Sequence, residues 1–322
     1  MGVWGLKTYT ETIQKLKSNI DRVILGKDEV IELLAASLLC SGHVLLEDVP
    51  GVGKTTMAKA LAKSISCSFK RIQFTPDLLP SDLTGVNIYN QGSGSFEFMK
   101  GPLFTNILLA DEINRATPRT QSSLLECMEE LQITVDGETY ALEKPFLVIA
   151  TQNPVENYGT FPLPEAQLDR FMMKIKLGYP GRQYEEDILG RSQADNPMND
   201  IEAVCSPQDI EEMQLACNGV HVDDDIKGYI LDIAEATRTN EQIELGASPR
   251  ASMALYKASQ AFAYIKGREF VKPDDIIYLA PYILSHRLII NRSSAHKRRD
   301  AFELMREIVA GIDIPLERVK RR

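Results

Sequence analysis

The sequence predicts an α/β protein in which an αβα core with a mostly parallel sheet is followed by a smaller all-helical domain. Five apolar or β-branched runs are each short enough for a strand and too continuous for half-exposed alternation, at residues 43–47, 69–74, 107–110, 146–151 and 172–177. After Gly178-Tyr179-Pro180-Gly181 these runs stop and one helical pattern follows another. We therefore place the core at residues 1–181 and the all-helical domain at residues 182–322.

Apolar periodicity and capping residues place the helices. An apolar helical face at residues 30–38 precedes the first strand and can cover it. A helix over residues 118–131 separates the third and fourth strands and begins with proline, which fits a first turn. In the second domain, three helices begin at Ser206-Pro207, Ser248-Pro249 and Lys272-Pro273.

Two segments interrupt the alternation of strands and helices. Residues 86–98 carry two β-prone runs around a Gly-Ser-Gly turn, which predicts a hairpin inserted into a helix. Residues 133–140 predict a second hairpin, because Asp136-Gly137 suits a type I′ turn. The two hairpins lie on one side of the core in this scheme, which suggests a working surface; decorative loops are the alternative.

The composition indicates a water-soluble globular chain of 322 residues, with 44% hydrophobic and 25% charged residues. No apolar run approaches the roughly 18 residues of a membrane span, and the N-terminus resembles no signal peptide, so we expect a cytoplasmic protein without membrane insertion. Five scattered cysteines favour reduced thiols over a disulfide or zinc framework. A net charge of −9 argues against strong DNA binding, and we interpret basic runs at 296–299 and 318–322 as solvated ends.

The run Pro50-Gly51-Val52-Gly53-Lys54-Thr55-Thr56 has the chemistry of a nucleotide phosphate loop. Such a loop needs glycines where N–H groups turn toward phosphates, a lysine that reaches the β and γ phosphates, and a hydroxyl for Mg²⁺. The full pattern would have glycine at position 48, where this chain has Asp48. An apolar strand before the loop and a run of strong helix formers after it favour a phosphate site over an ordinary glycine-rich turn.

Polar residues that end two later strands extend this site. Asp111 and Glu112 follow an apolar strand about fifty residues after the loop, a placement that suits a Mg²⁺-binding acid beside a base for the attacking water. Asn153 follows the fourth strand, so it lies at the carboxyl edge of the sheet, where open α/β folds bind ligands. It can orient the water or contact the γ phosphate; an Asx-turn before Pro154 is the alternative.

Two arginines are candidates for a further part of the site. Arg170 lies just before the last strand and could complete the site of a neighbouring subunit as an arginine finger. Arg250 lies in the first turn of a capped helix of the second domain, from which we expect it to reach the γ phosphate across the domain cleft. From the residues alone, a surface salt bridge explains each arginine equally well.

Five ordered blocks together resemble the AAA+ ATPases, and within them the MoxR family, over nearly the whole chain. The blocks are Leu45-Leu46-Glu47-Asp48-Val49-Pro50-Gly51-Val52-Gly53-Lys54-Thr55, Ala110-Asp111-Glu112-Ile113-Asn114-Arg115-Ala116, Ala150-Thr151-Gln152-Asn153-Pro154, Leu163-Pro164-Glu165-Ala166-Gln167-Leu168-Asp169-Arg170-Phe171 and Gly246-Ala247-Ser248-Pro249-Arg250. The roles that the resemblance implies are Walker A for Lys54 and Thr55, Walker B for Asp111 and Glu112, sensor 1 for Asn153, the arginine finger for Arg170 and sensor 2 for Arg250.

The resemblance also implies a ring, usually a homo-hexamer, with ATP and Mg²⁺ between subunits. Gly26 resembles the segment that contacts adenine, and the two hairpins resemble the family's helix-2 insert and pre-sensor-1 hairpin, which line or flank the ring pore. Relatives carry either glycine or an acid at the position of Asp48, so activity is expected to survive this departure. The family is thought to activate partner complexes, often through von Willebrand factor A domain proteins.

Three functions follow as hypotheses. The first is an ATP-hydrolysing motor that remodels partner proteins in the manner of a chaperone. The second is a nucleic-acid motor, against which the acidic balance and the lack of a helix-turn-helix, zinc or base-stacking module argue. The third is a nucleotide-gated scaffold with little turnover, which intact acids at Asp111 and Glu112 disfavour.

Overall fold

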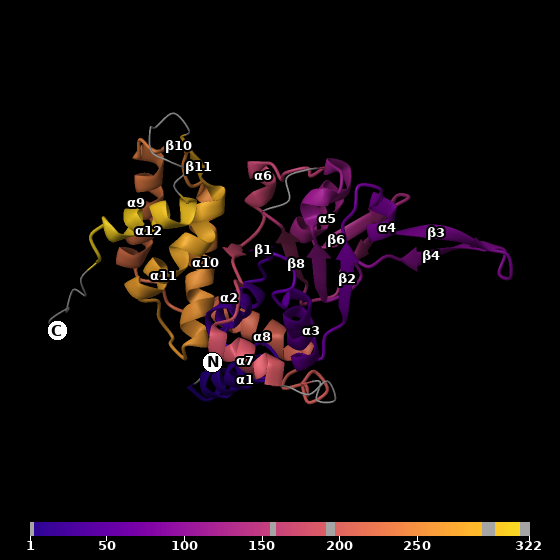
Figure 1. The fold of residues 1–322 in the computed structure, drawn as a ribbon, viewed down its shortest axis with the longest axis horizontal. Helices are drawn as coiled ribbons and strands as arrows, with labels where there is room; N and C mark the ends of the chain where they lie inside the picture. The colour runs from indigo at the N-terminus through magenta and orange to yellow at the C-terminus, as the bar shows by residue number, and fades with distance from the viewer. Residues whose placement is uncertain (1–2, 155–158, 191–196, 292–299, 316–322) are drawn as a thin grey trace.

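A computed structural model of the chain describes residues 3–154, 159–190, 197–291 and 300–315. The basic runs at 296–299 and 318–322 lie outside the described residues. Figure 1 shows a sheet-containing core beside a group of helices from the C-terminal part of the chain. Among the described residues, no helix has both the length and the apolar character needed to cross a membrane.

A five-stranded parallel sheet forms the centre of the core, in the order β2-β5-β8-β1-β9. Its strands are β1 (Val44–Glu47), β2 (Phe69–Gln73), β5 (Ile107–Asp111), β8 (Leu147–Gln152) and β9 (Met173–Ile175). Each strand corresponds to one of the five apolar runs, so the prediction of a parallel-sheet core is confirmed. We call the edge where the strands end the carboxyl edge and the edge where they begin the amino edge.

Helices cover both faces of this sheet. Side chains alternate between the two faces along each strand, so each strand contributes to both layers. On β1, Val44 and Leu46 belong to an apolar cluster with helices of the first layer, whereas Leu45 belongs to a second cluster. The first layer contains α1 (Val3–Asp21), α2 (Asp28–Leu39) and α3 (Lys54–Ser64), and the second is built on α5 (Pro118–Glu130). α2 and α5 match the two helices predicted for this region.

The strand β2 departs from the prediction of continuous burial. Arg71 and Gln73 are exposed, whereas Ile72 between them is buried. The reason is that β2 lies at the edge of the sheet, where one face has no covering layer. Arg71 and Gln73 are two positions apart, so their side chains lie on the same open face.

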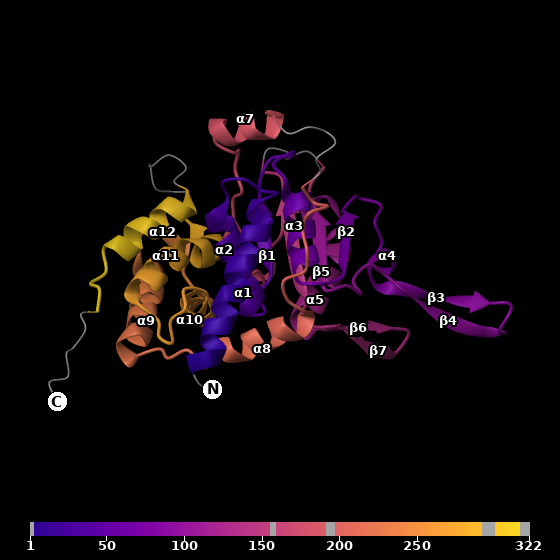
Figure 2. The same cartoon turned by 90° about the horizontal axis from the view of Figure 1, so that it is seen from below.

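Both hairpins are present and project away from the C-terminal helices (Figures 1 and 2). The first comprises β3 (Gly85–Asn90) and β4 (Ser95–Lys100), and the second comprises β6 (Gln132–Val135) and β7 (Glu138–Ala141). Asp136 and Gly137 have φ of 51° and 87°, as a type I′ turn requires. Phe98 stacks on Tyr140 with ring centroids 4.4 Å apart, which joins the two hairpins.

The first hairpin is not inserted into a continuous helix, contrary to the prediction. The helix α4 (Pro80–Thr84) precedes it, but turns follow β4 at residues 101–106. Gly85 and Gly101 lie at the base of the hairpin, where a Cβ at either would lie 2.2 Å from a backbone carbonyl oxygen of the opposing chain segment. The two segments therefore approach each other too closely for a side chain at either position.

The described residues of the C-terminal part are mostly helical, but they include a small antiparallel sheet of β10 (Ile243–Leu245) and β11 (Ile289–Ile290), which an all-helical domain would lack. Its helices are α7 (Arg182–Gly190), α8 (Pro207–Cys217), α9 (Asp224–Thr239), α10 (Pro249–Ile265), α11 (Pro273–Leu284) and α12 (Ala301–Ala310). Ser206 and Ser248 accept N-cap hydrogen bonds, so the predicted starts of α8 and α10 are confirmed. The boundary near residue 181 stays a prediction, since one apolar cluster contains side chains from both sides of it.

Candidate nucleotide site

The phosphate loop connects β1 to α3 at the carboxyl edge. Gly51 and Gly53 have φ of 87° and 93°, a left-handed backbone that turns successive N–H groups to one side. Gly53 is the N-cap of α3 and no side chain caps that helix, so its first N–H groups can receive an anion. Lys54 begins α3, and its Nζ donates to the carbonyl oxygen of Asp48 at 3.0 Å.

Asp48, which stands where the general pattern has glycine, is buried and turned away from the loop. Its carboxylate accepts N–H bonds from Leu177 and, at 3.1 Å, from Gly178, just after β9. Its own N–H donates to Gln152 at 3.1 Å, which continues the β1–β8 pairing. Asp48 is not among the positive-φ residues, so the backbone does not require glycine here. The departure from the pattern therefore links the phosphate loop to the end of β9.

The two predicted acids lie at the end of β5 in different environments. Asp111 accepts hydrogen bonds from Thr151 Oγ1 at 2.6 Å and from Arg71 Nη2 at 2.6 Å. Glu112 has a φ of 56°, an uncommon conformation for a non-glycine residue that often marks a functional site. Its carboxylate accepts from Gln73 Nε2 at 2.8 Å and pairs with Arg115 at 2.8 Å.

The residues that contact these acids were missed from the sequence. Arg71 and Gln73 lie on the edge strand β2, where polar alternation within the run 69–74 was a usable signal. Thr151 accepts from the Glu112 N–H at 2.9 Å while it donates to Asp111. Its threonine side chain gave no signal inside an otherwise apolar strand.

The strand order brings the predicted hydrolytic residues to one edge. β8 lies between β5 and β1, so Asn153 at its end is positioned between the phosphate loop and the Asp111-Glu112 pair. Asn153 is buried, with 7% of its surface exposed. Loop, acids and amide thus converge at the carboxyl edge from three adjacent strands, which is the arrangement of ligand sites in open α/β sheets.

Mg²⁺ and the nucleotide fit this set of residues. Mg²⁺ is usually held by one or two carboxylates or hydroxyls plus substrate phosphates and waters, rather than by a cage of protein ligands. Thr55 in the first turn of α3 and Asp111 would supply that partial set. Among the described residues, no group of three histidine, cysteine, aspartate or glutamate side chains could hold a metal ion.

The predicted adenine segment lies beside the loop. A Cβ placed on Gly53 would lie 3.2 Å from Ile24 Cδ1, and one on Gly26 would lie 2.2 Å from Tyr184 Cε2. Gly26 therefore permits close approach of the Tyr184 ring, which comes from α7. Tyr184 is a candidate nucleotide contact that the sequence did not reveal.

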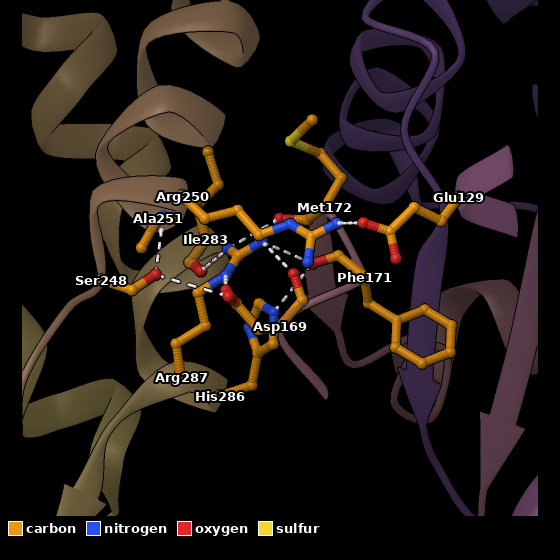
Figure 3. Close-up of polar contacts among 10 residues, drawn as sticks. All are labelled: Glu129, Asp169, Phe171, Met172, Ser248, Arg250, Ala251, Ile283, His286 and Arg287. Carbon is orange, nitrogen blue, oxygen red and sulfur yellow. Dashed lines mark hydrogen bonds and ion pairs between the residues drawn. The ribbon is translucent and has the colours of Figure 1, made fainter. Parts of the chain in front are cut away.

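The two arginines lie together, but at the amino edge. Arg250 Nη2 and Arg170 Nη2 contact the two carboxylate oxygens of Glu129 at 2.6 and 3.3 Å. These residues line a cavity of about 280 Å³ that also contains Gly42 and His43, which precede β1. We call this cavity the arginine cleft. Figure 3 shows Arg250 reaching from the helical part toward Glu129 at the end of α5.

The position of Arg250 corrects an expectation. It was expected to reach the γ phosphate across the domain cleft, yet Lys54 follows the carboxyl end of β1 and the arginine cleft lies at its amino end. The four residues of β1 alone separate the two by about 13 Å. A single chain thus brings Arg250 to Arg170 and not to its own phosphate loop.

Comparisons with known proteins agree with this architecture. Residues 43–173 match the family model "ATPase family associated with various cellular activities (AAA)", and residues 235–308 match an AAA lid domain. The chain is 51% identical to uncharacterized protein YeaC of Bacillus subtilis, with 94% of this chain and 95% of that protein covered. It is 41% identical to Chaperone MoxR1 of Mycobacterium tuberculosis, with coverages of 90% and 78%.

A solved structure extends the similarity to three dimensions. The crystal structure of a provisionally assigned ATPase from Cytophaga hutchinsonii superposes with a TM-score of 0.90 at 40% identity. The superposition covers 97% of each chain. Core, hairpins and lid are therefore shared along nearly the full length.

Proposed function

The chain belongs to the MoxR-type AAA+ ATPases, and from that premise we propose that it hydrolyses ATP with Mg²⁺ to drive the remodelling of partner protein complexes. The observation that carries the hydrolytic part is the convergence of the phosphate loop, Asp111, Glu112 and Asn153 at one edge of the sheet. A site that only retained nucleotide would not need a water-activating acid beside the metal-binding one.

Each residue has a distinct part in the proposed reaction. The loop N–H groups and Lys54 would bind the phosphates, and Thr55 and Asp111 would hold the metal, whose charge would offset that of the phosphate oxygens. Glu112 orients the attacking water and accepts its proton, and Asn153 fixes the water or the γ phosphate. Gly26 and the neighbouring Tyr184 would hold the adenine.

The arginine cleft supports a site shared between subunits. Arg170 and Arg250 lie at the amino edge, away from their own loop, yet both guanidiniums are side by side and reach the surface. We infer that both act on the nucleotide of a neighbouring chain in a ring, a homo-hexamer by the family's usual architecture. Positive charge placed there stabilises the transition state of phosphoryl transfer.

The partner-remodelling part is supported by the relatives and by the two hairpins. The relative from Mycobacterium tuberculosis is named a chaperone. The β3–β4 hairpin exposes Val86, Ile88, Phe96 and Met99, apolar side chains suited to gripping a polypeptide at the pore. We propose a von Willebrand factor A domain protein as the partner.

The free thiols of all five cysteines support a reducing compartment such as the cytoplasm.

The test of hydrolysis is Glu112→Gln. This change keeps the side-chain shape but removes the base, so turnover should fall by about 10² to 10⁴-fold while ATP affinity is retained. Steady-state phosphate release and equilibrium binding of a fluorescent ATP analogue measure the two quantities. Undiminished hydrolysis in the variant would refute the role of Glu112, and stimulation of turnover by DNA would favour a nucleic-acid motor instead.

A further inference from the structure

Arg287, the last residue of the 3₁₀ turn η2 (Ser285–Arg287), is a buried guanidinium in the helical part that contacts the core. Only 3% of its side chain is exposed. Its Nε donates to Asp169 Oδ1 at 2.6 Å (Figure 3). Its other nitrogens donate to the backbone carbonyls of Ile283, Asp169 (3.2 Å), Phe171 (2.7 Å) and Met172 (3.3 Å). Arg287 therefore fastens residues 169–172, the segment that contains Arg170, to the helical part.

The neighbouring His286 strengthens this attachment. Burial and the adjacent Arg287 charge lower the pKa of His286 well below its usual value, so the imidazole is neutral. Its Nε2 lies 3.1 Å from the Phe171 carbonyl oxygen, to which it donates. Two consecutive side chains of η2 thus bind the same short segment.

Asp169 extends the contacts to the helix that carries Arg250. Its second carboxylate oxygen accepts from Ser248 Oγ at 3.4 Å. Ser248 is the N-cap of α10, and its Oγ accepts from the Ala251 N–H at 3.2 Å. Arg250 lies in this first turn, so Asp169 contacts the capping group of the turn that presents Arg250.

These contacts form a continuous network of hydrogen bonds and ion pairs that includes both arginines. Arg170 follows Asp169 directly, and Arg250 lies two residues after Ser248. Both arginines then meet again at Glu129. Asp169 takes part in both arms of this network. Its side chain is only 21% exposed, and without the matching charge of Arg287 the carboxylate would turn toward water.

We propose that Arg287 is a positioning residue for the arginine pair, one that sets the finger segment and the start of α10 at a fixed separation. The inference rests on the proposed function, in which Arg170 and Arg250 serve the nucleotide of a neighbouring subunit. Arg287 lines the arginine cleft with only 3% of its side chain exposed, and it acts through Asp169. Removing it displaces both arginines while its own subunit keeps an intact phosphate loop.

Mixed rings test this separation of roles. Arg287→Met subunits should bind ATP as tightly as wild type but turn over about 100-fold more slowly, since a misplacement of about 1 Å at a reacting group can cost that much. Mixing them with Lys54→Ala subunits should restore activity, because the latter supply well-placed arginines to intact phosphate loops. The reference is the same mixing experiment with Arg170→Ala in place of Arg287→Met.

A matched control separates positioning from lid stability. Arg268 forms an ion pair with Asp275 at 2.6 Å, also largely buried within the helical part. Arg268→Met should lower the unfolding temperature comparably and leave turnover of assembled rings within about twofold. If Arg287→Met subunits do not fold, Asp169→Asn removes the same charge match with less loss of volume and should show the same recovery on mixing.

The outcomes are distinct. Recovery in both mixtures supports the proposal. Recovery with Arg170→Ala but not with Arg287→Met or Asp169→Asn overturns the role of Arg287 and leaves the shared site standing. Equal loss of turnover in Arg268→Met also overturns it, because lid stability would then explain the effect. Failure of the Arg170→Ala mixture in demonstrably mixed rings removes the shared site itself, and the proposal with it.

Discussion

The carboxyl and amino edges of the sheet carry opposite halves of a charged site, and each half contains a counter-charge from its own chain. At the carboxyl edge, Asp111 is paired with Arg71. At the amino edge, Arg170 and Arg250 are paired with Glu129. The acids and the phosphate loop would face the nucleotide of this chain, and the arginines would face that of the next.

The difference shows what an isolated chain lacks. The carboxyl edge carries the residues proposed to bind phosphate and to activate water, but the arginines that could stabilise the transition state lie about a strand's length away. In the proposed ring, a phosphate–metal pair between subunits would compete with both counter-charges, Arg71 and Glu129. Substitutions at the two edges are therefore expected to differ in how much ATP binding and how much turnover they lose.

The largest effect is expected from Arg170→Ala. Loss of an arginine finger should lower turnover by about 10³-fold or more, while ATP affinity changes little because binding resides at the other edge. Phosphate release and nucleotide binding, measured on the same preparation, check this. Glu129→Gln is the control, since it keeps both arginines and should retain most turnover. Weakened ATP binding with normal turnover in Arg170→Ala would contradict this assignment, because Arg170 would then belong to the half of the site that binds the nucleotide.

The sequence predicted the carboxyl edge better than the amino edge. The carboxyl edge consists of residues that directly follow single strands, such as Asp111 and Asn153, and parallel strands always bring their ends together. Position in the chain was therefore enough to predict the edge at which these residues lie. The same logic placed the phosphate loop after β1 and its helix after the loop.

The amino edge could not be predicted in this way. Glu129, Arg170, Arg250 and Arg287 come from four distant segments, which meet where η2 and the start of α10 contact residues 169–172. No spacing in the sequence encodes that docking. Arg250 was accordingly assigned to the wrong edge, and Arg287 gave no motif.

The next largest effect concerns pH and the amino edge. His43 Nδ1 accepts from the Val148 N–H and Nε2 donates to Met128 O, both at 3.0 Å, so its imidazole is neutral. Burial lowers the pKa of His43 to about 4. As pH falls below about 6.5, the unfolded chain binds a proton at His43 that the folded chain does not bind. The free energy of unfolding therefore decreases as pH falls from about 6.5 to about 4, by up to about 3 kcal/mol.

Urea unfolding across this pH range measures that loss, with His43→Gln as the control. The glutamine amide can both donate and accept but does not titrate, so the variant should lose about 3 kcal/mol less over the range. Parallel pH profiles for the two proteins would mean that His43 does not control the acid sensitivity.

Asp48 tests the link between the phosphate loop and β9. Asp48→Ala leaves the Leu177 and Gly178 N–H groups without their acceptor, which should destabilise the fold by about 1 to 3 kcal/mol. Asp48→Asn keeps an acceptor oxygen and should cost less. Thermal unfolding with and without ATP measures both. A fully stable alanine variant would show that Asp48 merely occupies the glycine position without tying it to β9.

The smallest effect is expected at Arg71, which would compete with a bound metal for Asp111. Its side chain is 47% exposed, and an ion pair of this kind contributes at most about 1 kcal/mol, or about fivefold in affinity. Arg71→Met should thus lower the Mg²⁺ concentration that half-saturates binding of a fluorescent ATP analogue by up to about fivefold. Arg115→Met removes the same charge from the same edge. Because Arg115 pairs with Glu112 rather than with Asp111, this substitution should shift the midpoint much less. Equal shifts in the two variants would point to overall charge rather than to the Arg71–Asp111 pair, and a raised midpoint in Arg71→Met would mean that Arg71 contacts the nucleotide itself.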